Sequence, residues 1–199
     1  MRELLIATHN TGKISEFEAG LKDTPFTLRT MRDTDIDPDF RVEEVGQTFE
    51  GNALIKALVC GKKSGMLAIA DDSGLEIDAL DGEPGVRSAR YAPGTDKDRC
   101  GHVLAKMRGV PDEGRGAQFR CVLALYEPGR EKIRIAEGVC RGRITHEARG
   151  EKGFGYDPIF LCDDLGITAA EASLEQKNSI SHRGRALAKA REILLAEFA

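Results

Sequence analysis

The chain has 199 residues, of which 41% are hydrophobic and 31% charged, and its formal net charge is −4. This length fits one domain, or one domain with a modest lobe, and leaves room for a core and a cleft. The negative charge argues against a general nucleic-acid coat and against binding to anionic membranes, because both require an excess of basic surface. No apolar run approaches the roughly 18 residues of a membrane span, and the five cysteines lack a C-x-x-C pair, as is typical of reduced core residues. We therefore expect a soluble, cytoplasmic protein with no nucleic-acid partner and no membrane partner.

The first predicted unit is a strand, a polar loop and a helix. Leu4 to Ala7 is a short apolar strand, and residues 8–13 that follow read Thr-His-Asn-Thr-Gly-Lys. Backbone N–H groups at the start of a helix, together with the side chains of Thr8, Asn10 and Lys13, would suit a phosphate group. The alternative interpretation is that Asn10 only caps the helix and that Lys13 is solvated.

An acidic segment follows a second predicted strand. The spacing of the acids between residues 33 and 44 matches an EF-hand loop, but Pro38 stands where the sharp turn of such a loop needs glycine. An acidic loop leading to Glu44 fits better than a calcium site.

On the helix that comes next, Asn52 and Lys56 are four residues apart and share one face. Lys56 could reach a phosphate from there, or it could be solvated.

The stretch around Asp71 and Asp72 is the centre of the prediction. The apolar run from Met66 to Ala70 predicts a strand, Asp-Asp-Ser-Gly predicts a tight turn, and the alternating residues from Leu75 onward predict a second strand. Two neighbouring carboxylates at the exit of a buried strand repel each other unless a cation or a shared proton offsets their charge, and paired oxygens suit Mg²⁺. The alternative is an ordinary Asp-Ser-Gly hairpin turn.

The second half of the sequence predicts two long strands and a glycine-rich segment. Phe119 to Tyr126 and Lys132 to Val139 are strand candidates joined by a hairpin turn, and we expect them to form the lobe that partners the first half. In the segment from Gly150 to Phe160, Phe154 and Tyr156 could stack on a base. A glycine-rich turn before a strand explains the same residues without a ligand.

Basic residues gather near the start of the last predicted helix. Ser173 to Gln176 is a capping box, and Ser181 begins the C-terminal helix. Lys177, His182 and Arg183 oppose the preference of a helix start for acids, which indicates an anion or an oxygen-rich ligand nearby. A solvated basic face is the alternative.

Several segments together carry a resemblance to a known family. They are residues 8–13, 43–46, 48–49, 52–53, 70–75, 85–91, 153–158 and 179–184. In order and spacing, over nearly the whole chain, they resemble the inosine/xanthosine triphosphate pyrophosphatase family. The resemblance implies a mixed α/β fold, namely a single domain over residues 1–199 of two lobes with a long central sheet and the nucleotide in the cleft between them. It also implies a homodimer.

The same resemblance implies the reaction and the cofactor. The expected reaction is hydrolysis of ITP, dITP and XTP to the monophosphate and pyrophosphate with Mg²⁺, which keeps deaminated purines out of DNA and RNA precursor pools. Position by position, Glu44 and Asp72 would hold the metal, and Asp72 would accept the proton of the attacking water with Asp71 beside it. The residues expected to bind the substrate are Thr8, His9, Asn10, Thr11, Gly12, Lys13, Lys56, Ser73, Phe154, Gly155, Tyr156, Asp157, Lys177, His182 and Arg183. His9 and Gln176 depart from the family pattern, which leaves the fine specificity open.

Base selection would depend on the 6-keto oxygen of hypoxanthine and xanthine. A donor from the segment of His182 and Arg183 would pair with that oxygen and discriminate against ATP, so Arg183→Ala is expected to erode the preference for ITP over ATP. Rejection of GTP must come from elsewhere, because guanine has the same oxygen. Two alternatives remain open, namely a pyrophosphatase for modified pyrimidine triphosphates and a nucleotide-binding module without turnover.

Overall fold

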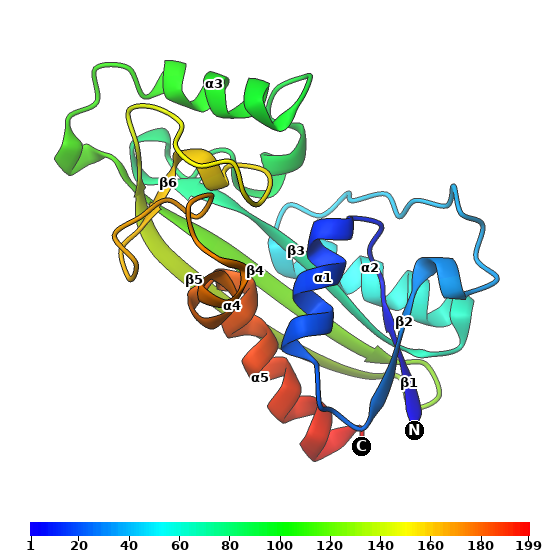
Figure 1. Cartoon of the computed structure of the whole chain (residues 1–199). Coiled ribbons are helices and arrows are strands. Elements are labelled where there is room, and N and C mark those ends of the chain that lie inside the picture. The colour runs from blue at the N-terminus through cyan, green and yellow to red at the C-terminus, as the bar shows by residue number, and fades with distance from the viewer. The chain divides into compact units, whose positions relative to one another are not determined.

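The computed structural model describes the backbone of the whole chain and every side chain except those of Leu174 and Asn178. The strands are β1 (Arg2–Ile6), β2 (Phe26–Thr30), β3 (Leu67–Ile77), β4 (Gly116–Glu127), β5 (Lys132–Ile144) and β6 (Phe160–Cys162). The helices are α1 (Thr11–Gly20), α2 (Phe49–Ser64), α3 (Asp96–Lys106), α4 (Leu174–Ile180) and α5 (His182–Glu197). The strands form one sheet in the order β2-β1-β3-β4-β5-β6 (Figure 1). None of the helices described is long and apolar enough to cross a membrane.

The chain divides into two compact units. Unit 1 contains residues 1–72, 121–138 and 183–199, and unit 2 contains residues 73–120 and 139–182. The sheet is mixed, because β1 is parallel to β2 and β3 whereas β5 and β6 are antiparallel. The predicted mixed α/β fold with a long central sheet is confirmed.

In unit 1, the strand order determines which face each helix covers. The crossover through α1 leads from β1 to β2 on one side, and the crossover through α2 leads back past β1 to β3. Because such crossovers are right-handed, two that run in opposite directions place their helices on opposite faces of the sheet. Helices α1 and α5 cover one face, and α2 covers the other (Figure 1). At Gly20 of α1 an added Cβ would lie 2.8 Å from a methyl carbon of Leu187, so the contact between α1 and α5 is close.

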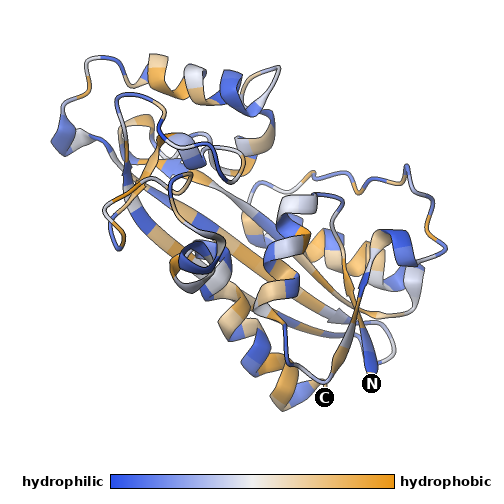
Figure 2. Ribbon diagram, viewed as in Figure 1, coloured by the Kyte–Doolittle hydropathy of each residue, from blue (hydrophilic) through white to orange (hydrophobic). Residues whose placement is uncertain are grey.

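The core of unit 1 explains the continuous apolar runs of its strands. A strand that is covered on both faces carries apolar residues without alternation. Hydrophobic residues run along β1, whereas α5 has alternating hydrophobic and hydrophilic bands because only one of its faces is buried (Figure 2). The core side chains include Leu4, Ile6, Phe17, Leu21, Ile69, Leu123, Leu187, Ala190, Leu194 and Phe198.

A glycine in α2 allows close packing against β4, and its replacement is a testable prediction. A Cβ at Gly61 would lie 2.7 Å from Tyr126 Cδ1. We expect Gly61→Ala to lower the free energy of unfolding, because overpacking costs about 1–3 kcal/mol and exceeds the gain in helix propensity of about 0.5–1 kcal/mol. Gly101 of α3 has open space around its Cβ position, so Gly101→Ala is the matched control and should stabilise. Urea denaturation of both variants checks this, and equal stabilisation of the two would contradict it.

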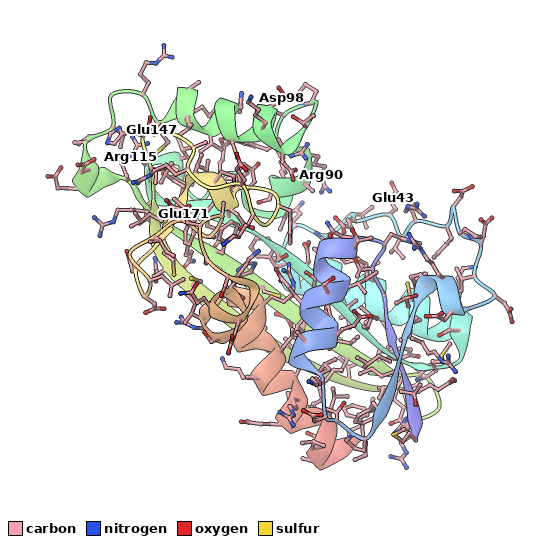
Figure 3. The ribbon with its side chains drawn as sticks, viewed as in Figure 1. Glu43, Arg90, Asp98, Arg115, Glu147 and Glu171 are labelled. Atoms are coloured by element: carbon pink, nitrogen blue, oxygen red, sulfur yellow. The ribbon has the colours of Figure 1, made fainter. Side chains whose placement is uncertain are left out.

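Unit 2 has its own core and its own capped helix. Thr95 and Asp98 form a capping box at the start of α3, and Asp98 is seen there in Figure 3. Residues 85–90 form a short 3-10 helix. The core side chains include Leu75, Ile77, Val103, Met107, Phe119, Tyr156, Ile159 and Phe160.

The structure differs from the sequence prediction at the centre of the chain. The predicted turn at residues 71–74 is wrong, because β3 runs without interruption from Leu67 to Ile77. Turn chemistry is a local preference, and here ion pairs and hydrogen bonds from distant residues satisfy the carboxylates within the strand. The predicted hairpin of β4 and β5 does not form a lobe of its own, because residues 121–138 belong to unit 1 and the remainder of both strands to unit 2.

Candidate active site

The predicted phosphate loop follows β1, at a position where parallel sheets commonly bind ligands. A switch point arises at the carboxyl ends of two neighbouring parallel strands whose next strands lie in opposite directions along the sheet, as β2 and β4 do for β1 and β3. In unit 1 this point lies between β1 and β3, where the Ala7 N–H donates to the Ile69 carbonyl oxygen at 2.8 Å. The loop after β1 and the acidic pair of β3 therefore both lie at the switch point.

The loop itself is ordered by short-range hydrogen bonds. Asn10 caps α1, because its Oδ1 accepts the N–H of Lys13 at 3.1 Å. The Thr8 hydroxyl oxygen accepts the Asn10 N–H at 3.2 Å, and a ring nitrogen of His9 lies 3.1 Å from the Phe40 carbonyl oxygen. The capping role of Asn10 is confirmed, and phosphate binding by residues 8–13 stays a prediction.

Asp71 and Asp72 lie in separate sets of contacts. Successive side chains of a strand point to opposite faces, so the two carboxylates cannot form one pair of ligands side by side, as the predicted turn would have allowed. Asp71 contacts Lys13 of α1, whereas Asp72 contacts Asn52 of α2. Each carboxylate is thus held by a helix on its own face of unit 1.

The contacts of Asp71 form a buried ionic network. Its Oδ2 lies 2.9 Å from Lys13 Nζ and 3.1 Å from Arg183 Nη2. Burial by itself would raise the pKa of Asp71, but the two cations hold that pKa well below its ordinary value. Arg183 also pairs with Glu16, and the two carboxylates outweigh the effect of burial and raise the pKa of Arg183 above its ordinary value. The lowered pKa favours the charged form of Asp71, which pairs with Lys13.

On the other face, Asp72 and Glu44 converge on one ammonium group. Lys56 Nζ lies 2.7 Å from Glu44 Oε1 and 3.7 Å from Asp72 Oδ1. Burial raises the pKa of Asp72, Lys56 and Asn52 oppose that shift, and the charges of Glu44 and Asp71 add to it. Burial would lower the pKa of Lys56, but the carboxylates around it raise that pKa. The cluster therefore holds two carboxylates in the neighbourhood of one cation.

These carboxylates are a suitable donor set for Mg²⁺. Mg²⁺ in nucleotide sites is held by one or two carboxylates, and waters and phosphate oxygens complete its shell. Among the side chains that the structure describes, no group of three or more His, Cys, Asp or Glu could hold a metal ion, so a site built entirely from such ligands is not found in that part of the chain. Glu43, which directly precedes Glu44 in the sequence, lies in the segment before α2 (Figure 3). The converging oxygens of Glu44 and Asp72 fit the Mg²⁺ pattern.

The glycine-rich segment of unit 2 is organised around Asp157. The Oδ2 atom of Asp157 accepts the Phe154 N–H at 2.9 Å and lies 2.8 Å from Lys177 Nζ. Lys177 Nζ also lies 4.6 Å from the centre of the Phe154 ring. Gly153 has φ +77°, and an added Cβ would lie 2.1 Å from Asp157 Oδ2. Position 153 therefore requires glycine, both for its conformation and for this close approach.

A second set of contacts holds the same segment from α3. Asp96 Oδ2 accepts the Gly155 N–H at 2.7 Å, and the Cys100 thiol donates to the Gly155 carbonyl oxygen at 3.3 Å. The Tyr156 hydroxyl donates to the Ser88 carbonyl oxygen at 2.8 Å, and its ring is a buried part of the unit 2 core. The Tyr156 ring is therefore not available to stack on a base, and Phe154, which is half-buried, is the aromatic residue that remains for this role.

Lys177, Asp157 and His182 line a small cavity in unit 2. The ring of His182 stacks on Phe119 with 4.8 Å between ring centres. The cavity measures about 20 Å³, which is room for about one water molecule. A purine could not enter it, so a base that contacts these residues would lie across its opening. The other lining residues are Cys140, Phe160, Cys162, Leu165, Ala169, Ala172, Ile180 and Ser181.

The predicted site residues fall into two groups, one in each unit. The structure brings together Lys13, Asp71 and Arg183 in unit 1, and likewise Glu44, Lys56 and Asp72. In unit 2 it brings together Phe154, Asp157 and Lys177. Ser73 is half-buried in the middle of β3. The guanidinium of Arg183 is enclosed by carboxylates, which differs from the predicted role of pairing with a base.

Sequence reasoning missed Glu16 of unit 1, and it placed Asn52 on the same helix face as Lys56 without giving it a role in the site. Glu16 of α1 is 3% exposed and pairs with Arg183, and Asn52 of α2 is fully buried and donates to Asp72. The signal that could have found Glu16 was helical spacing, since Glu16 lies one turn after Lys13, just as Asn52 lies one turn before Lys56. A polar residue one turn from a site lysine points to the same face.

Comparisons with known proteins identify the family of this chain. The model of the Ham1 family matches residues 4–193. A dITP/XTP pyrophosphatase of Bacillus licheniformis is 47% identical, with 98% of each chain covered, and one of Geobacter sulfurreducens is 49% identical, with 94% of each chain covered. A HAM1 protein from Coxiella burnetii has a structure with a TM-score of 0.88 and 41% identity, covering 98% of this chain and 99% of its own. The chain therefore belongs to the Ham1 family.

Proposed function

We propose that this protein hydrolyses dITP, XTP and ITP to the nucleoside monophosphate and pyrophosphate. The observation that carries the proposal is the cluster of Glu44, Lys56 and Asp72 at the switch point of unit 1, in a chain closely similar to two dITP/XTP pyrophosphatases. Removal of these nucleotides would keep deaminated purines out of the precursor pools of DNA and RNA.

The proposed mechanism assigns separate tasks to the two faces of unit 1. Glu44 and Asp72 would hold Mg²⁺, which supplies charge neutralisation and Lewis acidity at the phosphoryl oxygens. Asp72 would orient a water molecule and take its proton during attack at the α-phosphorus. Lys13 and Lys56 would stabilise the negative charge of the departing pyrophosphate. The loop of residues 8–13 would bind the triphosphate through its backbone N–H groups.

Recognition of the base is assigned to unit 2, with residue roles that differ from those predicted from the sequence. Phe154 would stack on the purine, and a donor near the start of α5 would pair with the 6-keto oxygen, where adenine has an amino group. Because the guanidinium of Arg183 is held by Asp71 and Glu16, His182 is the better candidate for that donor. Lys177 and Asp157 would set the position of Phe154.

The role of His182 yields a prediction on specificity. His182→Phe keeps an aromatic ring to stack on Phe119 but removes both ring nitrogens. We expect the ratio of kcat/KM for ITP over ATP to fall by at least about 10-fold, because a lost or mispaired polar group in a base site changes selectivity by large factors. Steady-state kinetics on both nucleotides measure the ratio. An unchanged ratio would remove His182 from base selection.

The proposed function is tested by pyrophosphate release from a panel of nucleotides with Mg²⁺. The panel contains dITP, XTP, ITP, GTP, ATP and modified pyrimidine triphosphates. Fast release from dITP, XTP and ITP with little from ATP and GTP is the expected result. A preference for modified pyrimidines would favour the alternative pyrophosphatase, and binding without any release would favour the nucleotide-binding module.

Three features stay predictions that separate measurements would check. Mg²⁺ as the cofactor predicts that EDTA abolishes activity and that added Mg²⁺ restores it. A homodimer predicts twice the chain mass in light scattering. A cytoplasmic location predicts that the protein stays in the soluble fraction of its cells.

A further inference from the structure

Asn52 is a fully buried polar side chain whose amide group has a partner at each end. Its Nδ2 donates to Asp72 Oδ2 at 3.0 Å, and its Oδ1 accepts the N–H of Gly46 at 2.8 Å. Gly46 follows Glu44 by two residues, in the loop that precedes α2. One amide therefore joins the segment that carries Glu44 to the strand that carries Asp72.

The position of Asn52 follows from the geometry of α2. Thr48 caps this helix, and Asn52 lies in its first turns with Lys56 four residues later. Residues at this spacing point to the same face of a helix, which here is the face toward Asp72. Asn52 holds one oxygen of Asp72, while Lys56 Nζ lies 3.7 Å from the other. Both oxygens of that carboxylate are therefore oriented by the same helix.

The loop before α2 approaches Asn52 closely at Gly46. A Cβ at Gly46 would lie 2.5 Å from Asn52 Oδ1 and 3.0 Å from its backbone nitrogen. No side chain fits at position 46 without displacing the amide. The contact thus depends on glycine at one end and on an amide of this length at the other.

We propose that Asn52 is a positioning residue that sets the separation and orientation of Glu44 and Asp72 for metal binding and catalysis. The proposal rests on the proposed function of these two carboxylates. An amide suits this task, because its oxygen accepts from a backbone N–H while its nitrogen donates to a carboxylate. Partners that orient metal-binding residues commonly change metal affinity or activity by 10–100-fold.

The test uses two substitutions that differ in which contact they remove. Asn52→Leu removes both hydrogen bonds. Asn52→Asp keeps the acceptor for Gly46 but sets an oxygen against Asp72 Oδ2. The control is Thr168→Val, which removes the fully buried hydroxyl that donates to the Arg149 carbonyl oxygen in unit 2.

The expected result separates positioning from a general effect on folding. Both Asn52 variants should lower kcat for dITP about 10–100-fold, with a much smaller change in KM. They should also weaken Mn²⁺ binding to the nucleotide-free protein, measured by electron paramagnetic resonance. Thr168→Val should lower the unfolding midpoint and leave kcat and Mn²⁺ affinity unchanged. Equal kcat and equal Mn²⁺ affinity in wild type and Asn52→Leu would overturn the proposal.

A reciprocal exchange tests the contact without any catalytic assay. In Asn52→Asp/Asp72→Asn the new amide at position 72 can donate to the new carboxylate at position 52, so the unfolding midpoint should rise above that of Asn52→Asp alone. A midpoint no higher than that of Asn52→Asp would overturn the proposal. If wild type released no pyrophosphate from any nucleotide, the proposed function would fail, while Mn²⁺ binding and the exchange would still decide the role of Asn52.

Discussion

Asp72→Asn is expected to lower kcat for dITP by about 10²–10⁴-fold, the range associated with the loss of a positioned general base. The substitution removes the negative charge that the proposed mechanism uses for the metal and for the water proton. The fold should persist, since the amide oxygen of asparagine can still accept the hydrogen bond from Asn52 Nδ2. Single-turnover measurement of dITP hydrolysis checks the rate, and circular dichroism checks the fold.

The matched control for this prediction is a surface carboxylate. Asp163 has a half-exposed side chain, and its contact with Arg143 is 3.6 Å long, so Asp163→Asn should leave kcat unchanged. Asp163→Asn is expected to keep the activity of wild type. If Asp72→Asn kept it as well, the assignment of Asp72 as the base would be wrong.

Arg183→Met is expected to lower the free energy of unfolding by about 3–5 kcal/mol, because one partner of a buried ionic network is removed. The guanidinium is 1% exposed and lies between Asp71 and Glu16. Without it, Lys13 is the cation that contacts Asp71, and Glu16 loses its ion pair with Arg183 inside the core. Chemical denaturation with both fluorescence and circular dichroism measures the loss.

Two further variants make this prediction specific to burial. Arg134 pairs with Glu197 at 2.7 Å, but its side chain is 44% exposed, so Arg134→Met should cost no more than about 1 kcal/mol. Adding Glu16→Gln to Arg183→Met should recover part of the lost stability, since it removes the charge left without its arginine. Equal losses in Arg183→Met and Arg134→Met would contradict the account of the network.

The same network explains why Arg183→Ala is a poor probe of base specificity. Its side chain contributes to the stability of unit 1, so any change in the ratio of ITP to ATP turnover would be mixed with a loss of folded protein. His182→Phe avoids this problem because an aromatic ring can still stack on Phe119.

Features set by short-range sequence patterns were predicted well. The cap at Asn10, the capping box at Ser173, and the strand and helix that follow the N-terminus all agree with the structure. Caps depend on hydrogen bonds across three residues, and the apolar face of a helix repeats within one or two turns. Both are therefore visible in a short window of sequence.

Features that depend on distant partners were not predictable in the same way. Asp71 to Gly74 has the composition of a turn, yet it lies in a strand because Lys13, Asn52 and Arg183 satisfy its carboxylates. The enclosure of Arg183 by Asp71 and Glu16 requires knowledge of three elements at once. Tyr156 illustrates the same limit, because an aromatic residue in a glycine-rich segment can stack on a ligand or pack in a core, and only the tertiary structure shows the latter.

Hydrolysis of dITP in water labelled with ¹⁸O tests whether water attacks the α-phosphorus of a deaminated purine triphosphate. Mass spectrometry of the products identifies where the label is incorporated. We expect one ¹⁸O atom in dIMP and none in pyrophosphate. Label in pyrophosphate, or release of orthophosphate in its place, would contradict it.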